Sequence, residues 1–169
     1  MVKAYALQAR AGFLRNFIFG VEDSLVSTVG LLSGVAVADV DKKTILLAGI
    51  VLIFVEAFSM GVGSYLSEIQ EAGYLKKKRD KMRPIMDGLI MFGSYFLTGF
   101  LPLSPYLALP REVAFWTSIF FALAALFLLG FAAARIAKVP LLQNALRMLV
   151  VGGTAVVLGV GVGLFVSAI

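Results

Sequence analysis

The segment TILLAGIVLIFVEAFSMGVGSYLSEI, residues 44–69, decides the fold of this chain. It is long enough to cross about 30 Å of hydrocarbon as a helix, and it lacks the alternation of polar and apolar residues typical of a strand. The whole chain shares this character, because 60% of its 169 residues are hydrophobic, 15% are charged and its mean hydropathy is +0.97. Soluble domains carry about 25% charged residues. The sequence therefore predicts an all-α membrane protein.

Outward from this segment, four more apolar stretches lie at residues 13–38, 84–103, 113–137 and 142–167. Together with residues 44–69 they predict five transmembrane helices in one transmembrane domain that covers residues 1–169. Pro84 and Pro140 stand where the first turn of a helix tolerates proline. We expect Pro102, Pro105 and Pro110 to form a short, stiff outer loop after the third helix.

The basic residues are distributed unevenly along this path. Twelve of the 15 Lys and Arg residues fall on the side of the N-terminus and three on the other side. By the positive-inside rule the N-terminus is cytoplasmic and the C-terminus lies outside. The net charge of +5 therefore predicts an orientation and no nucleic-acid partner. Within this pattern, the cluster from Lys76 to Arg83 indicates an anchor at the cytoplasmic surface, and the first dozen residues fit an interfacial helix before the first span.

The chain contains neither cysteine nor histidine. Disulfides, thiolate chemistry, Cys/His metal sites and a histidine proton relay are thereby excluded. The sequence also shows no nucleophile with a partnered base. We therefore expect neither an enzyme nor a resident cofactor.

Acidic residues inside the predicted spans are the strongest functional candidates, because an ionisable group is costly in a membrane. Glu22 and Asp23 lie inside the first helix, and Asp23 is roughly 12 Å deeper than Arg15 at 1.5 Å per residue. Glu56 lies roughly 18 Å along the second helix, near the bilayer centre. Helical geometry places Met60 on the face of Glu56, followed by Gly63 and Ser67. A cation held between the two helices by Asp23, Glu56 and Met60 is therefore geometrically reasonable, with Glu22 as a weaker candidate.

These side chains indicate which ion would bind. Carboxylates suit hard or borderline divalent ions, and a thioether shifts the preference toward transition metals and away from Mg²⁺ or Ca²⁺. The set thus favours Fe²⁺ or Mn²⁺. Metal and protons would compete for the same carboxylates, and such competition is what metal/proton exchange requires.

Residues of the same kinds also have simpler roles in membrane proteins. An acid inside a span can merely accept a hydrogen bond, and a methionine is often core filler. Asp87 stands one turn after Pro84, where a carboxylate complements a helix N-terminus. Glu68 and Glu71 end the second helix at the cytoplasmic surface, either as solvated acids or as a metal-collecting vestibule. The glycine pair Gly30 and Gly34, and the alternating glycines of the last helix, are typical of close helix packing or dimer contacts.

Two stretches resemble one known family. The residues RAGFLR (10–15) and FGVEDSLVSTVGLLSGV (19–35) look like the opening of the vacuolar iron transporter family, and EAFSMGVGSYLS (56–67) is similar to its second-helix motif. The resemblance implies a homodimer with a path between the first and second helices of both subunits, which exports Fe²⁺ and sometimes Mn²⁺ in exchange for protons. Asp23, Glu56 and Met60 match the transport-site positions of the family.

The chain departs from the family pattern at two places. Ser24 follows Asp23 where the family often has glycine, and Glu22 adds an extra acid. Many members also carry an acidic, Met-rich cytoplasmic domain between the second and third helices, where this chain has only the short basic connection from about residue 70 to 83. This chain is similar to a short form that lacks that domain.

The leading hypothesis is a dimeric divalent-metal/proton antiporter that removes Fe²⁺ or Mn²⁺ from the cytoplasm. Two alternatives stay open: a proton-coupled exporter of organic cations, and a subunit of a membrane assembly that transports nothing. The expected location is a prokaryotic plasma membrane, or a vacuolar membrane in a eukaryote.

Overall fold

The structure, a computed structural model, describes the backbone of residues 2–75 and 82–169 and the side chains of residues 10–75 and 82–169. The described residues form five helices in chain order: α1 (Val2–Val37), α2 (Lys42–Tyr74), α3 (Met82–Ala108), α4 (Arg111–Ala137) and α5 (Leu141–Ser167). All five are long and apolar enough to cross a membrane. The prediction of an all-helical, five-span chain is confirmed, and the protein is an integral membrane protein.

Helix α1 begins earlier than the predicted first span. It runs without a break from Val2 and therefore includes the segment that we expected to form a separate interfacial helix. The residues VKAYALQARA before Gly12 explain this difference, because they are mostly good helix formers and contain no proline that would end a turn. Residues 76–81 of the basic cluster from Lys76 to Arg83 lie outside the described residues.

Helix α3 also corrects an expectation, because Pro102 and Pro105 lie inside the helix and do not form an outer loop. Proline cannot donate a hydrogen bond to the carbonyl four residues earlier, which for Pro105 is that of Leu101. The Ser104 hydroxyl donates to this carbonyl instead, at 2.9 Å. Serine commonly satisfies freed backbone groups in membrane helices. Pro110 alone remains in the connection, as the N-cap residue of α4.

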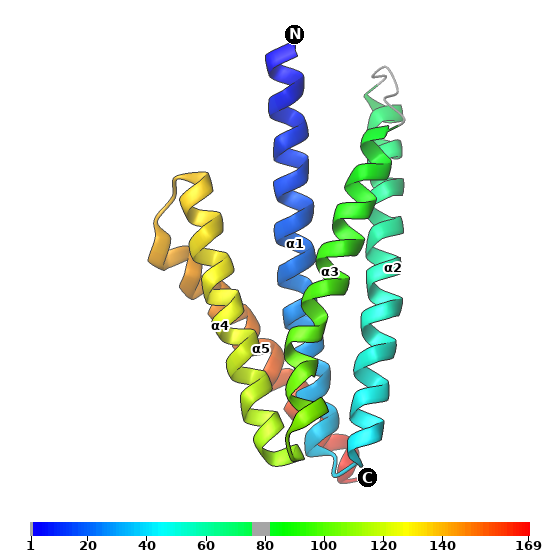
Figure 1. The fold of residues 1–169 in the computed structure, drawn as a ribbon, viewed down its shortest axis with the longest axis vertical. Coiled ribbons are helices and arrows are strands. Elements are labelled where there is room, and N and C mark those ends of the chain that lie inside the picture. The colour runs from blue at the N-terminus through cyan, green and yellow to red at the C-terminus, as the bar shows by residue number, and fades with distance from the viewer. Residues whose placement is uncertain (1, 76–81) are drawn as a thin grey trace.

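Helix α1 occupies the centre of the bundle. It contacts each of the other four helices, while α2 packs mainly on α3, and α4 packs on α5 (Figure 1). The two ends of the chain lie at opposite ends of the molecule (Figure 1), as an odd number of spans requires. The orientation of these ends relative to the cytoplasm stays a prediction.

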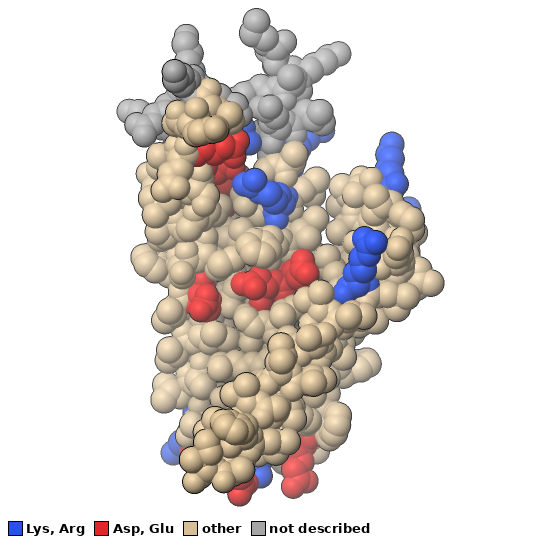
Figure 2. Space-filling view, turned by 180° about the vertical axis from the view of Figure 1, so that it is seen from behind, with Lys and Arg blue, Asp and Glu red and all other residues tan. Residues whose placement is uncertain are grey.

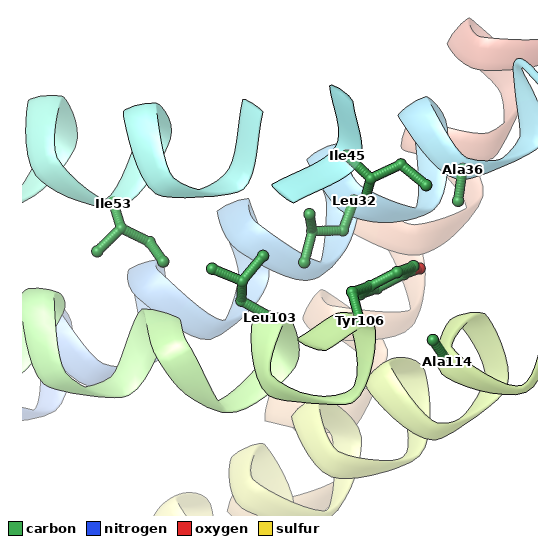
Figure 3. Close-up of a cluster of buried hydrophobic side chains, with 7 residues drawn as sticks. All are labelled: Leu32, Ala36, Ile45, Ile53, Leu103, Tyr106 and Ala114. Atoms are coloured by element: carbon green, nitrogen blue, oxygen red, sulfur yellow. The ribbon is translucent and has the colours of Figure 1, made fainter. Parts of the chain in front are cut away.

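A cluster of buried apolar side chains joins the first four helices at the end where α1 finishes. Figure 3 shows its members, which are Leu32 and Ala36 of α1, Ile45 and Ile53 of α2, Leu103 and Tyr106 of α3, and Ala114 of α4. Close packing of this kind holds membrane helices together, since lipid tails are as apolar as the side chains. The cluster fixes the position of α2 relative to α1, and with it the relative positions of the acids on these helices.

Glycines bring α1 and α5 into backbone contact. A Cβ atom added at Gly34 would lie 2.5 Å from the carbonyl oxygen of Gly159, and one added at Gly163 would collide with the carbonyl oxygen of Gly34. These glycines therefore pack two helices of the same chain. Of the two roles considered for this pattern, close helix packing is confirmed.

Asp41 sets the beginning of α2. The hydroxyl of Thr44 and its backbone N–H both donate to the Asp41 carboxylate, the latter at 3.3 Å. The hydroxyl bond is the main reason why the pKa of Asp41 is lowered from its ordinary value. An ionised N-cap of this kind satisfies backbone donors that the first turn leaves free.

Candidate transport site

The structure brings the acids of the first two helices together. Asp23 of α1 and Glu56 of α2 are close enough for their charges to interact, and the charge of Glu22 interacts with that of Asp23. All three side chains are half-buried. Figure 2 shows acidic side chains in the middle of one face, well away from both ends of the molecule. The predicted juxtaposition of Asp23 and Glu56 is therefore present in a single chain.

Within residues 10–75 and 82–169, neither Asp23 nor Glu56 forms an ion pair with a lysine or arginine. Two like charges that repel each other inside a span are expensive unless a cation or protons neutralise them. The same residues contain no group of three acids arranged to hold a metal ion. One chain thus presents an acidic pair and not a complete carboxylate cage.

The other residues predicted on the Glu56 face follow it along α2. Met60, one turn further, is half-buried, and Ser67 is exposed. Gly63 has no atom within 4 Å of the place where a Cβ would stand. A strip of α2 beyond Glu56 is thus open to approach in the single chain.

A buried tyrosine stands behind the acids and was not among the predicted residues. Tyr95 of α3 is fully buried, and its hydroxyl lies 2.6 Å from that of Ser27. The charges of Asp23 and Glu56 both act on this tyrosine. The contact of Tyr95 with Ser27 depends on how α1 packs against α3. The only signal for it in the sequence is the position of a tyrosine in the middle of a span.

Small residues hold α1 against α3 beside Tyr95. The Ser24 hydroxyl donates to the backbone carbonyl of Tyr95 at 2.6 Å, and a Cβ at Gly99 would lie only 3.0 Å from the same hydroxyl. A Cβ at Gly20 would lie closer still to the Ser94 hydroxyl. Gly20 is therefore a packing residue, and the contact between the two helices fixes the position of the Tyr95 ring.

An apolar groove opens next to the acids. It has a volume of about 670 Å³ and runs between α1 and α5, with Leu52 of α2 at its side. Val26 and Ser27, one turn beyond Glu22 and Asp23, line it at one end, and Ala38 and Val166 line it at the other. The acids thus stand at the inner end of a groove that extends toward the end of the molecule where α1 finishes.

A second charged cluster ties three helices together nearer the opposite end. Arg15 of α1 contacts Glu68 of α2 at 2.8 Å, and Arg83 of α3 lies 4.0 Å from Glu68 and 3.8 Å from Asp87. The side chains of Glu68 and Asp87 are only 11% and 5% exposed. Asp87 lies in the second turn of α3 beside Arg83, so it does not cap the helix. Glu71 is exposed near the end of α2.

Comparison with known proteins identifies the family of the chain. The family model described as "VIT family" matches residues 14–83 and 68–164. Vacuolar iron transporter homolog 4 of Arabidopsis thaliana is 27% identical over 165 residues, which cover 90% of this chain and 83% of that protein. Homolog 3 of the same plant is 26% identical over 94% of this chain and 86% of its own length.

A shorter match has a higher sequence identity. Vacuolar iron transporter homolog 1 of Arabidopsis thaliana is 37% identical over 65 residues, which cover 38% of this chain and 32% of that protein. The family model, in contrast, extends over all five helices. The chain belongs to the VIT family.

Proposed function

We propose that this protein is a homodimeric antiporter that moves Fe²⁺, Mn²⁺ or both out of the cytoplasm in exchange for protons. The observation that carries the proposal is the electrostatic interaction between Asp23 and Glu56, which lie in two adjacent spans without a described basic partner. Charged groups inside membrane spans are retained mainly where they bind or conduct something. Membership of the VIT family and the names of the relatives support a metal ion as the cargo.

The ligand atoms available on α1 and α2 favour a transition metal. Asp23 and Glu56 supply carboxylate oxygens, and Met60 supplies a thioether one turn from Glu56 on the same face of the helix. Mg²⁺ and Ca²⁺ prefer oxygen alone, whereas a thioether tolerates softer ions. Met60 is therefore assigned the role of selecting Fe²⁺ or Mn²⁺ over Mg²⁺.

Proton coupling follows from the same two carboxylates. When the metal leaves, their mutual repulsion favours binding of a proton. Metal and proton therefore alternate at one site, and exposure of this site first to one side and then to the other couples the two flows. No separate proton channel is needed.

A second copy of the chain would complete the ligand set. Most homodimers are twofold symmetric, so that each subunit presents the same surface to the other. A twofold axis beside α1 and α2 would bring a second Asp23, Glu56 and Met60 toward the first, and the open strip at Gly63 leaves room for a close approach. The location that fits is a prokaryotic plasma membrane, or a vacuolar membrane in a eukaryote.

The test is metal uptake into proteoliposomes under an imposed pH gradient, with Fe²⁺, Mn²⁺, Co²⁺ and Mg²⁺ compared. Wild-type protein should carry Fe²⁺ or Mn²⁺, and both Asp23→Asn and Glu56→Gln should lower the flux by about 100-fold or more, since each loses a direct ligand. Glu112→Gln is the matched control, because Glu112 is an exposed acid in the first turn of α4. Wild-type flux from folded Glu56→Gln would overturn the role of Glu56.

The apolar groove favours one second candidate, a proton-coupled exporter of amphiphilic organic cations. A groove of about 670 Å³ that ends beside carboxylates would hold the apolar body and the charge of such a cation. Its lining is aliphatic and glycine-rich, without the aromatic faces that often bind organic cations. Saturable, gradient-driven flux of tetraphenylphosphonium, with no flux of any metal, would favour this candidate.

A further inference from the structure

The hydroxyl pair of Ser27 and Tyr95 lies near the acids but has no role in the proposed function. Ser27 follows Asp23 by four residues, so the two side chains share a face of α1 and are separated by about 6 Å along the axis. Ser27 also lines the apolar groove, while Tyr95 is fully buried behind it on α3. Ser27 therefore lies one turn from Asp23, at the end of the groove that is nearer to the acids.

The hydrogen bonds around this pair decide whether the Ser27 hydroxyl donates or accepts. The Ser27 hydroxyl has the carbonyl of Ser24 as an acceptor at 3.4 Å, and the Tyr95 hydroxyl lies 2.6 Å from Ser27. If Ser27 donates to Ser24, Tyr95 donates to Ser27, and both buried protons are satisfied. A hydroxyl has two lone pairs, so one remains on Ser27 after it accepts the bond from Tyr95.

We propose that Ser27 is an additional cation-binding residue, one turn along α1 from Asp23, and that Tyr95 is a positioning residue that presents its oxygen to the cation. The inference rests on the proposed function, because the cation is the divalent metal ion held by Asp23 and Glu56. The hydroxyl adds a hard oxygen on the α1 side of the site. The thioether of Met60 supplies a softer atom on the α2 side, so Ser27 would favour Mn²⁺ over softer ions.

The packing of α3 against α1 makes this arrangement rigid. Ser24 is buried and binds the backbone carbonyl of Tyr95, which prevents the ring from moving along α1. This bond holds the Tyr95 backbone beside α1, and the Tyr95 hydroxyl lies opposite Ser27. A preorganised ligand loses less entropy on binding than a mobile one, which is the benefit of such a partner.

The test measures Mn²⁺ binding to the purified protein through the EPR signal of the free ion. Mn²⁺ flux in proteoliposomes is measured alongside. Ser27→Ala and Tyr95→Phe should each weaken Mn²⁺ binding by about tenfold, the usual effect of losing one metal-orienting contact. The double variant should be no weaker than Ser27→Ala alone, because Tyr95 acts through Ser27. Ser27→Thr keeps the hydroxyl and should restore Mn²⁺ affinity.

Tyr106→Phe is the matched control for Tyr95→Phe. Tyr106 is also a fully buried tyrosine of α3, but it belongs to the apolar cluster at the far end of the helix. Its variant should leave the Mn²⁺ affinity unchanged. Thermal melting of each variant separates a loss of binding from a loss of folding.

A second readout distinguishes a ligand role from a structural one. Without the Ser27 oxygen, the KM for Mn²⁺ should rise more than the KM for Co²⁺, so the preference between the two ions shifts toward Co²⁺. A variant that only loosens the helix packing would weaken both ions equally. An unchanged ratio of the two KM values in folded Ser27→Ala would contradict the proposal.

The failure of this inference can be told apart from failure of the proposed function. If Glu56→Gln loses Mn²⁺ binding and Ser27→Ala binds like wild type, the site stands and the role of Ser27 is overturned. If binding depends on Ser27 and Tyr95 but no metal is carried, the inference stands and the transport function fails. Wild-type protein that binds no Mn²⁺ would overturn the inference, while the flux of Fe²⁺ in proteoliposomes would still decide the proposed function.

Discussion

At the scale of single residues, the acids of this chain fall into two classes that differ in their partners. Glu68 contacts Arg15 of α1 and Asp87 lies beside Arg83 of its own helix, whereas the charges of Asp23 and Glu56 interact with each other. The charge of an acid of the first class is compensated within the fold, and Glu68 in this way joins α1 and α2. An acid of the second class adds repulsion to the fold and is available to a ligand.

This division predicts opposite effects of two similar substitutions. Glu68→Gln should lower the free energy of unfolding by about 1–2 kcal/mol, because it removes a bond to a partly exposed arginine and leaves a second arginine less compensated. The melting temperature in detergent should fall by a few degrees. Metal flux per folded molecule should stay close to that of wild type.

Glu56→Gln should show the reverse pattern. Loss of the Glu56 charge relieves the repulsion with Asp23, so the melting temperature should remain equal to or above that of wild type. Metal flux, in contrast, should be lost. Melting curves and flux measured on the same preparations check both statements. A destabilised Glu56→Gln together with a fully stable Glu68→Gln would contradict the assignment of the two classes.

At the scale of the elements, the contact between α1 and α5 depends on glycines. Gly163→Ala should lower the free energy of unfolding by about 1–3 kcal/mol, because the added methyl group would collide with the carbonyl oxygen of Gly34 and press on Val37. Gly161→Ala is the matched control, since nothing lies within 4 Å of its added methyl group. Equal melting temperatures for the two variants would show that the contact does not stabilise the bundle.

The helices could be predicted from the sequence because each carries its own signal, a long apolar run with punctuation at its ends. Their bounds were less predictable where a partner decides them. Pro102 and Pro105 indicated a loop, but Ser104 supplies a hydrogen bond that helps α3 to continue. Asp87 fitted a helix cap, but it lies in the second turn of α3 beside Arg83, which also reaches Glu68 of α2.

The candidate site was predictable to the same extent. Asp23 and Glu56 stand out because charge is rare within apolar runs, and antiparallel neighbouring helices bring the segment that follows Glu56 near the depth of Asp23. Tyr95 could not be assigned in this way, because its contact with Ser27 depends on how α3 packs against α1. Residues that act within one helix can be read from its sequence, whereas those that act across helices require the fold.

At the scale of the whole molecule, the absence of cysteine allows a direct test of orientation. Tyr74→Cys and Ser167→Cys place single thiols on exposed residues at the ends of α2 and α5. The positive-inside rule predicts that a membrane-impermeant maleimide labels Ser167→Cys in intact cells and labels Tyr74→Cys only after the membrane is opened. The opposite labelling pattern would reverse the orientation and the direction of export.

The central claim is that one acidic pair binds metal and protons in alternation. The most direct measurement records Mn²⁺ entry and proton movement at the same time in proteoliposomes that start without a pH gradient. Mn²⁺ entry should drive protons out of the vesicles, and Glu56→Gln should abolish both flows together. Mn²⁺ entry without any proton movement in wild-type protein would contradict the claim.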